Sequence, residues 1–191
     1  MTAPAGLAPP GGARRLLRAL DVLALGMAYA SGALFLLVSF YVAADAVGRT
    51  FFHVSSAVTD EFGGYALALG GTFALAYTLR TGAHVRIDIL LPYLPRHMQI
   101  VLDYVAMAGM ALFAAMLAAY TWRLALESLA GDARAMSFLR TPLFPPQGLV
   151  ALGLTLLCVE ALAILAVGVV ESLRQGRLAP PEGFDAPAEP S

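Results

Sequence analysis

Four long apolar stretches, separated by short polar segments, organise this chain. They run over residues 22–44, 62–79, 104–122 and 146–170. A helix needs ~20 mostly apolar residues to cross ~30 Å of hydrocarbon, and all four stretches are of about that length. They are rich in Ala, Leu and Gly and lack the alternation of a membrane β-strand. The pattern therefore predicts an all-α integral membrane protein with four transmembrane helices.

Composition agrees with a membrane location. Charged residues make up 13% of the chain and hydrophobic residues 59%, whereas a soluble domain carries about a quarter charged residues. A net charge of −1 excludes the basic surface that nucleic-acid binding requires. The composition therefore predicts that the lipid bilayer surrounds this protein and that nucleic acid is not a partner.

The arginines predict the orientation of the four helices. Cytoplasmic segments of membrane proteins carry an excess of Arg and Lys. The two tails and the segment between the second and third stretches hold eight of the twelve basic residues: Arg14, Arg15, Arg18, Arg80, Arg86, Arg96, Arg174 and Arg177. Both termini and that segment should therefore be cytoplasmic, in a multi-pass membrane protein. The segments 45–61 and 123–145 should face outward.

The ends of the chain differ from its centre. We expect a cytoplasmic tail over residues 1–19, a four-helix membrane domain over 20–172 and a disordered, proline-rich tail over 173–191. The first stretch resembles a secretory signal because arginines precede it. It is longer than the ~7–15 residues of a signal's apolar region, so we interpret it as a retained helix.

The charged segment after the second stretch carries a helical pattern of its own. Ile87, Leu90, Leu91 and Leu94 follow the spacing i, i+3, i+4 and i+7, which lines one face of a helix. A short amphipathic segment of this kind lies in the membrane interface, with its apolar face in lipid or against a partner.

Pro95 predicts the start of the next helix, because proline suits the first turn, where a backbone N–H has no helical partner. A helix from Pro95 to about Leu129 would be ~50 Å long and would have to tilt or protrude from the bilayer. Arg96 and Asp103 belong to a polar stripe at its start. We expect them to help set the depth of the helix at the cytoplasmic face.

Residues with possible metal or cofactor chemistry are few. His84 and Asp88 are spaced i, i+4, but no third ligand is evident, so an ion pair or a packing role is favoured over a metal site. The three histidines lie in loops or at helix ends, which argues against haem bound between helices. Cys158 lies alone in an apolar stretch. We expect no catalytic residues, no cofactor and no enzymatic activity.

Glu160 is an acidic residue well inside the fourth stretch. An ionisable group within a membrane helix suggests a proton or cation site by default. The alternative is a bond to a polar partner on a neighbouring helix. A lone carboxylate makes a poor ion path, so we favour the structural role.

Small and aromatic residues mark further candidate contacts. Small residues spaced by four let membrane helices approach closely, either within one bundle or against another subunit. Such faces occur at Gly26-x3-Ala30, Ala28-x3-Gly32, Ala66-x3-Gly70-x3-Ala74 and Ala111-x3-Ala115-x3-Ala119. Tyr120 and Trp122 lie where the third helix should reach the outer interface, as in an aromatic belt.

Several of these residues together resemble one known family, the small membrane subunit of tripartite ATP-independent periplasmic (TRAP) transporters. The most specific part is the run Arg80-Thr81-Gly82-Ala83-His84-Val85-Arg86-Ile87-Asp88, followed by Leu94-Pro95-Arg96. Supporting parts are the acidic pair Asp60-Glu61, Trp122, the motif Thr141-Pro142-Leu143-Phe144-Pro145-Pro146, and Gly153. The resemblance covers roughly residues 20–170. The sequence departs from it at Phe144, where a tryptophan is commoner, and at Glu160.

The resemblance implies a set of partners. Such a subunit pairs with a large membrane subunit that holds the substrate and sodium sites, and a periplasmic binding protein delivers organic acids. The small subunit is similar to a non-catalytic scaffold that braces the large one, and its outer loops would meet the binding protein transiently.

Three other functions remain open at this point. One is the small membrane subunit of a tripartite tricarboxylate transporter, against which the Gly-x-His-x-Arg-x-Asp run argues. Another is a membrane anchor of a respiratory complex, and the third is a small transporter that works alone.

Overall fold

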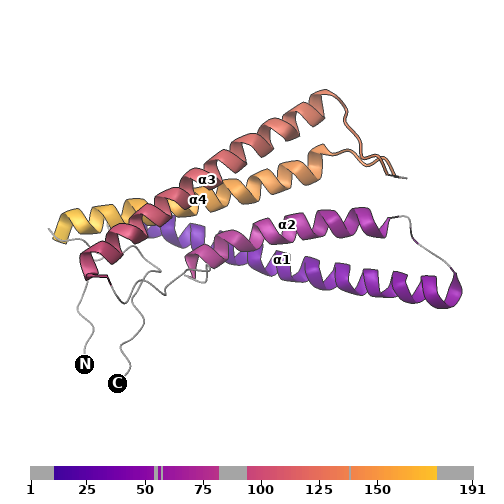
Figure 1. The fold of residues 1–191 in the computed structure, drawn as a ribbon, viewed down its shortest axis with the longest axis horizontal. Helices are drawn as coiled ribbons and strands as arrows, with labels where there is room; N and C mark the ends of the chain where they lie inside the picture. The colour runs from indigo at the N-terminus through magenta and orange to yellow at the C-terminus, as the bar shows by residue number, and fades with distance from the viewer. Residues whose placement is uncertain (1–10, 54–55, 57, 82–93, 138, 176–191) are drawn as a thin grey trace, which may run out of the picture.

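A computed structural model describes residues 11–53, 56, 58–81, 94–137 and 139–175, with the backbone alone for residues 11–18, 80 and 175. Within these residues the chain forms four α-helices: α1 (Gly11–Phe52), α2 (Thr59–Arg80), α3 (Arg96–Ala130) and α4 (Phe144–Gln175) (Figure 1). Each contains a segment long and apolar enough to cross a membrane. The prediction of an all-α protein with four transmembrane helices is confirmed.

The helices form two antiparallel hairpins that pack through α2 and α4. α1 packs along α2, and α3 packs along α4, so that α2 and α4 lie between the two outer helices (Figure 1). α1 touches α4 over a small area only. Since α2 and α4 both begin at an outward-facing loop of the predicted topology, they run parallel to each other.

The core between the hairpins is built on α4. Met107 and Ala111 of α3 pack with Leu157 and Ile164 of α4, and Leu79 of α2 closes the cluster from the other side. Met107 and Ile164 are almost completely buried. Small side chains at the remaining positions let the helix backbones approach closely, which is how helices associate where lipid removes the usual hydrophobic drive.

The expected small-residue face of the third helix lies partly inside the bundle and partly on its surface. Ala111 is buried, but Ala115 and Ala119 are exposed, and Ala114 and Ala118 are buried instead. A strict four-residue spacing drifts around a helix that has about 3.6 residues per turn, so steps of three and four must alternate to keep one face against α4.

The α1–α2 contact depends on Gly70. A Cβ atom placed on Gly70 would lie 2.7 Å from the ring of Phe35. The Ser31 hydroxyl donates a 2.6 Å hydrogen bond to the Gly70 carbonyl oxygen, and both residues are buried. The predicted small-residue face at Ala66 and Gly70 therefore packs inside the bundle.

The small-residue faces of α1 behave differently. A Cβ atom added to Gly26 or to Gly32 would meet nothing within 4 Å. These positions face away from the other described helices, so the chain leaves this part of α1 open.

α3 begins and ends close to where the sequence places it. Pro95 directly precedes the helix as its N-cap, and its carbonyl oxygen accepts hydrogen bonds from the Met98 and Gln99 backbone N–H groups. The sequence predicted Pro95 inside the first turn of the helix, whereas it lies one position before the first helical residue. At 35 residues, α3 is ~50 Å long. The predicted amphipathic segment at 87–94 lies almost entirely outside the described residues.

Two helices extend past the predicted limits of the membrane domain. α1 begins at Gly11, inside the segment expected to be a tail, and α4 continues to Gln175. Helical hydrogen bonding does not stop at the edge of the hydrocarbon, so hydropathy marks the membrane boundary and not the helix end.

Candidate functional site

A polar cluster joins the N-terminal end of α2, which the predicted topology places on the outer side, to the loop between α3 and α4. Glu61 is in the first turn of α2, and Tyr65 follows one turn later. The Tyr65 hydroxyl donates a 3.0 Å hydrogen bond to Glu61 Oε1. The Thr141 hydroxyl from the loop donates to the same oxygen and lies 3.1 Å from the Tyr65 hydroxyl. We call Glu61, Tyr65 and Thr141 the outer cluster.

The outer cluster connects residues that are distant in sequence. Tyr65 lies one turn from Glu61 on α2, whereas Thr141 lies 80 residues further along the chain. Two hydroxyl donors at one carboxylate oxygen fix the position of that carboxylate. The first hairpin is thereby attached to the loop of the second.

Backbone hydrogen bonds give this loop a defined shape. Gly131 donates to the Glu127 carbonyl at the end of α3, and Ala135 donates to the Thr141 carbonyl at 2.9 Å. An isolated bridge pairs Arg134 with Pro142. The loop therefore returns on itself as a short hairpin and presents Thr141 to α2.

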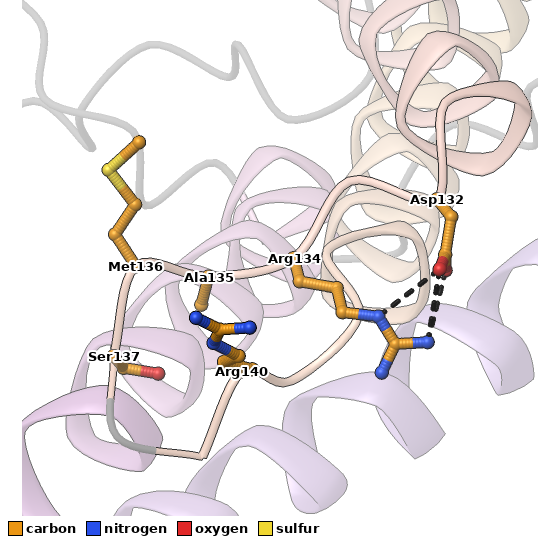
Figure 2. Close-up of a pocket in the computed structure, with 6 residues that line it drawn as sticks. All are labelled: Asp132, Arg134, Ala135, Met136, Ser137 and Arg140. Carbon is orange, nitrogen blue, oxygen red and sulfur yellow. Dashed lines mark hydrogen bonds and ion pairs between the residues drawn. The ribbon is translucent and has the colours of Figure 1, made fainter.

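A hollow of about 480 Å³ opens in the loop, lined by Asp132, Arg134, Ala135, Met136, Ser137 and Arg140 (Figure 2). Arg134 forms an ion pair with Asp132, with an N···O distance of 3.1 Å. Asp132 and Arg140 both have positive φ angles, 44° and 47°. Figure 2 shows the Arg134 guanidinium bonded to Asp132, while Arg140 lies beside Ala135 on the other strand of the loop.

The remaining predicted residues of the outer side are spread over the surface. Asp60 is exposed next to Glu61, so the acidic pair divides into one residue in the outer cluster and one outside it. Pro142 takes part in the bridge with Arg134. Pro145 is exposed in the first turn of α4, where proline fits because the backbone lacks a helical acceptor there.

Trp122 has a different environment from the one that an aromatic belt implies. Its indole Nε1 donates a 3.0 Å hydrogen bond to Thr155 Oγ1 of α4. Trp122 therefore bonds α3 to α4, while Tyr120 is exposed as a belt residue would be. The sequence carried no signal for this pair, because Trp122 and Thr155 lie 33 residues apart on the two helices of one hairpin.

On the predicted cytoplasmic side, Arg96 is exposed and Asp103 is partly buried. Next to them the Tyr104 hydroxyl lies 3.1 Å from the Ser172 hydroxyl and connects α3 to the end of α4. Gly82, His84, Arg86 and Asp88 lie outside the described residues. Arg80 is the last residue of α2, and its side chain is outside the description as well.

Glu160 is buried completely, with an exposed fraction of 0%. It lies on α4 between the buried residues Leu156 and Ile164. Among the residues that the structure describes, no group of three His, Cys, Asp or Glu side chains lies close enough to hold a metal ion.

A family model described as "Tripartite ATP-independent periplasmic transporters, DctQ component" matches residues 38–171. The match covers well over half of the chain. The chain belongs to this DctQ family. No curated protein and no solved structure matches it.

The matched region contains the outer cluster, Trp122 and Glu160. It establishes that this DctQ subunit is a small membrane component of a TRAP transporter. Such a transporter also contains a large membrane subunit and a periplasmic binding protein. Family membership thus decides against the tricarboxylate system and the respiratory anchor.

Proposed function

We propose that this DctQ subunit is a non-catalytic brace for the large TRAP membrane subunit during sodium-coupled uptake of an organic acid. Uptake requires part of the large subunit to move while another part stays fixed in the bilayer. A bundle that is rigid inside and apolar outside would enlarge the fixed part. The periplasmic binding protein would supply the organic acid.

The observation that supports this function most directly is the set of polar bonds between helices. Ser31 bonds α1 to α2, Trp122 bonds α3 to α4, and the outer cluster bonds α2 to the α3–α4 loop. Interhelical hydrogen bonds in membranes contribute ~0.6 kcal/mol each on average. Their distribution over all three interfaces favours a single rigid body over two independent hairpins.

The outer faces of the bundle favour a membrane partner. Large apolar side chains are exposed along α1 and α3, among them Leu36, Phe40, Leu112 and Phe113. On α1, an apolar hollow of about 770 Å³ is lined by Ala19, Val22, Leu23, Gly26, Met27 and Ala30. Since Gly26 leaves its surroundings open, a helix of the large subunit could approach closely here. We assign this α1 face to the large subunit.

The α3–α4 loop is our proposed contact for the periplasmic binding protein. It presents Arg134 and Arg140 around the hollow, and Met136 is fully exposed. Charged groups at the rim of an interface accelerate association more than they strengthen it, which suits a partner that binds and leaves. The proposal requires this loop to face the periplasm, as the arginine distribution predicts.

The same topology puts both termini in the cytoplasm and the subunit in the bacterial inner membrane. Arg80, Arg86 and Arg96, with Asp88 and Asp103, would fix the depth of α2 and α3 at the cytoplasmic face. We also expect the membrane domain to extend over residues 20–172, although the helices themselves extend further.

Reconstitution tests the proposed function. Proteoliposomes would contain the large subunit alone, this subunit alone, or both. The binding protein, loaded with a radiolabelled organic acid, would be added outside under an inward sodium gradient. We expect uptake only with all three proteins and the gradient. Uptake by this subunit alone, or full uptake without it, would refute the bracing role.

A further inference from the structure

The buried Glu160 raises the question of what balances its charge. Its exposed fraction is 0%, whereas acidic residues on the membrane's aqueous sides are exposed or half-exposed, such as Asp60 and Glu127. A charged side chain inside the hydrocarbon is costly unless an opposite charge or polar groups surround it. The register of α1, α2 and α4 indicates which charged residues lie at the level of Glu160 and could balance its charge.

α2 and α4 run parallel with a constant register. A Cβ atom on Gly153 would lie 3.1 Å from Thr72 Cβ, and Ala76 and Leu156 share one buried cluster. In these pairs the residue numbers differ by 80 or 81. Because both helices rise ~1.5 Å per residue, the same offset continues to their inner ends. It places Arg80 at the level of Glu160.

α1 runs antiparallel to α2 with an equally regular register. Ser31 bonds to Gly70, and Ala24 shares the buried cluster with Ala76. The same relation places Asp21 at the level of Arg80. Asp21 directly follows Leu20, which belongs to that cluster as well.

The helical position of Arg80 lies between the two neighbouring helices. On α2, Gly70 faces α1 and Thr72 faces α4, whereas Ala76 packs with residues of both helices. At about 100° per residue, position 80 falls between these two faces. On α4, Glu160 shares the face of Leu156 and Gly153 toward α2.

We propose that the positive charge at position 80 of α2 balances the buried charge of Glu160, and that Asp21 of α1, at the same level, belongs to the same charge network. The network fastens α2 to the second hairpin at its inner end, as the outer cluster does at its outer end. Glu160 is then a structural carboxylate and not a cation site. The proposal depends on the helix register and is independent of the bracing role.

Charge exchange in the full-length subunit, purified in detergent, tests the pair through the midpoint of thermal unfolding. We expect Arg80→Gln and Glu160→Gln each to lower the midpoint by about 10 °C, because removing one partner leaves a buried charge unbalanced. The exchange Arg80→Glu with Glu160→Arg should recover at least half of the loss. Exposed Arg123→Gln and Glu127→Gln on α3 are the matched controls and should shift the midpoint by less than about 2 °C.

The double-mutant cycle decides the outcome. If Arg80→Gln and Glu160→Gln together are closer to wild type than either single variant, the pair exists. If their losses add, or if Glu160→Gln leaves the midpoint unchanged, the proposal is wrong. This neutral cycle decides the question even where the exchanged protein fails to fold. For Asp21, the loss caused by Asp21→Asn should disappear in the Arg80→Gln background, and an additive loss would remove Asp21 from the network.

Discussion

The hydroxyl of Thr141 and the hydroxyl of Tyr65 lie 3.1 Å apart, and both bond to the same oxygen of Glu61. Thr141 precedes α4, while Tyr65 and Glu61 begin α2. Three side chains from two hairpins thus form one contact at the end of the bundle where α2 and α4 begin. The contact links the α3–α4 loop, which we propose meets the binding protein, to α2, the helix of the first hairpin that packs against α4.

Removing the Thr141 hydroxyl should loosen this link. We expect Thr141→Val to lower the thermal midpoint by a few degrees, because the Glu61 oxygen loses a donor from the loop. Protease cleavage within 131–143 should become faster as well. Thr50→Val is the control, since the Thr50 hydroxyl bonds only to its own helix. Unchanged cleavage in Thr141→Val would show that the outer cluster does not hold the loop.

Gly70 should tolerate no side chain. A Cβ atom there would overlap the Phe35 ring at 2.7 Å, so Gly70→Val should destabilise the bundle by about 1–3 kcal/mol. Gly71→Val is the matched control, because nothing lies within 4 Å of a Cβ at that position. Detergent unfolding of both variants measures the difference. Equal stability of the two proteins would contradict the close α1–α2 packing.

The Trp122–Thr155 bond should contribute to the α3–α4 contact. Trp122→Phe removes the indole donor, and we expect a loss of about 0.6–1.7 kcal/mol. Thr155→Val should add little in the Trp122→Phe background, because the two changes break the same bond. Tyr120→Phe, an exposed aromatic position nearby, is expected to be neutral. Fully additive losses at Trp122 and Thr155 would exclude the bond.

A bulky side chain on the open face of α1 should weaken the complex with the large subunit but leave the isolated subunit unchanged. We expect Gly26→Leu to reduce co-purification of the large subunit severalfold while the isolated subunit keeps its thermal midpoint. Gly109→Leu on α3 is the control, since Gly109 also has nothing within 4 Å of an added Cβ. Should Gly109→Leu disrupt the complex and Gly26→Leu leave it intact, the contact face would be on α3.

The arginines on the predicted cytoplasmic side should fix the depth of the subunit in the bilayer. Charge reversal by Arg86→Glu together with Arg96→Glu should reduce assembly with the large subunit or uptake. The physical reason is that arginines near the head groups hold helix ends at the interface. Reversal of Arg134, on the opposite side of the predicted topology, should leave assembly intact and slow binding of the periplasmic protein instead. Normal assembly and uptake by the Arg86/Arg96 double variant would disprove the anchoring role.

The number of helices and the long third helix could be predicted because they depend on local sequence. Apolar stretches of sufficient length must become helices in lipid, where backbone groups have no water to bond. Pro95 marks the start of α3 since it cannot continue a preceding helix. The sequence left open which alanines of α3 pack inside the bundle, because the choice between Ala114 and Ala115 depends on how α3 crosses α4.

The outer cluster could be predicted only in part. Glu61 and Thr141 both belong to motifs that resemble the TRAP family, but no local signal joins them. Their contact requires α2 and α4 to lie parallel at one register, and that register is a property of packing between hairpins. Tyr65 was missed because one tyrosine near a helix start is indistinguishable from an interface anchor.

By itself, the sequence determined the membrane class, the four helices and the family resemblance that the family match confirms, because each depends on local composition or short motifs. The orientation of the helices stays a prediction from the arginines. The tertiary structure alone decided which faces are buried, that Trp122 bonds to Thr155, and that Glu160 is completely buried. These relations depend on how close Gly70 and Gly153 let the backbones approach, which sets the register of whole helices. A residue's neighbours across a membrane interface follow from that register and not from its own segment.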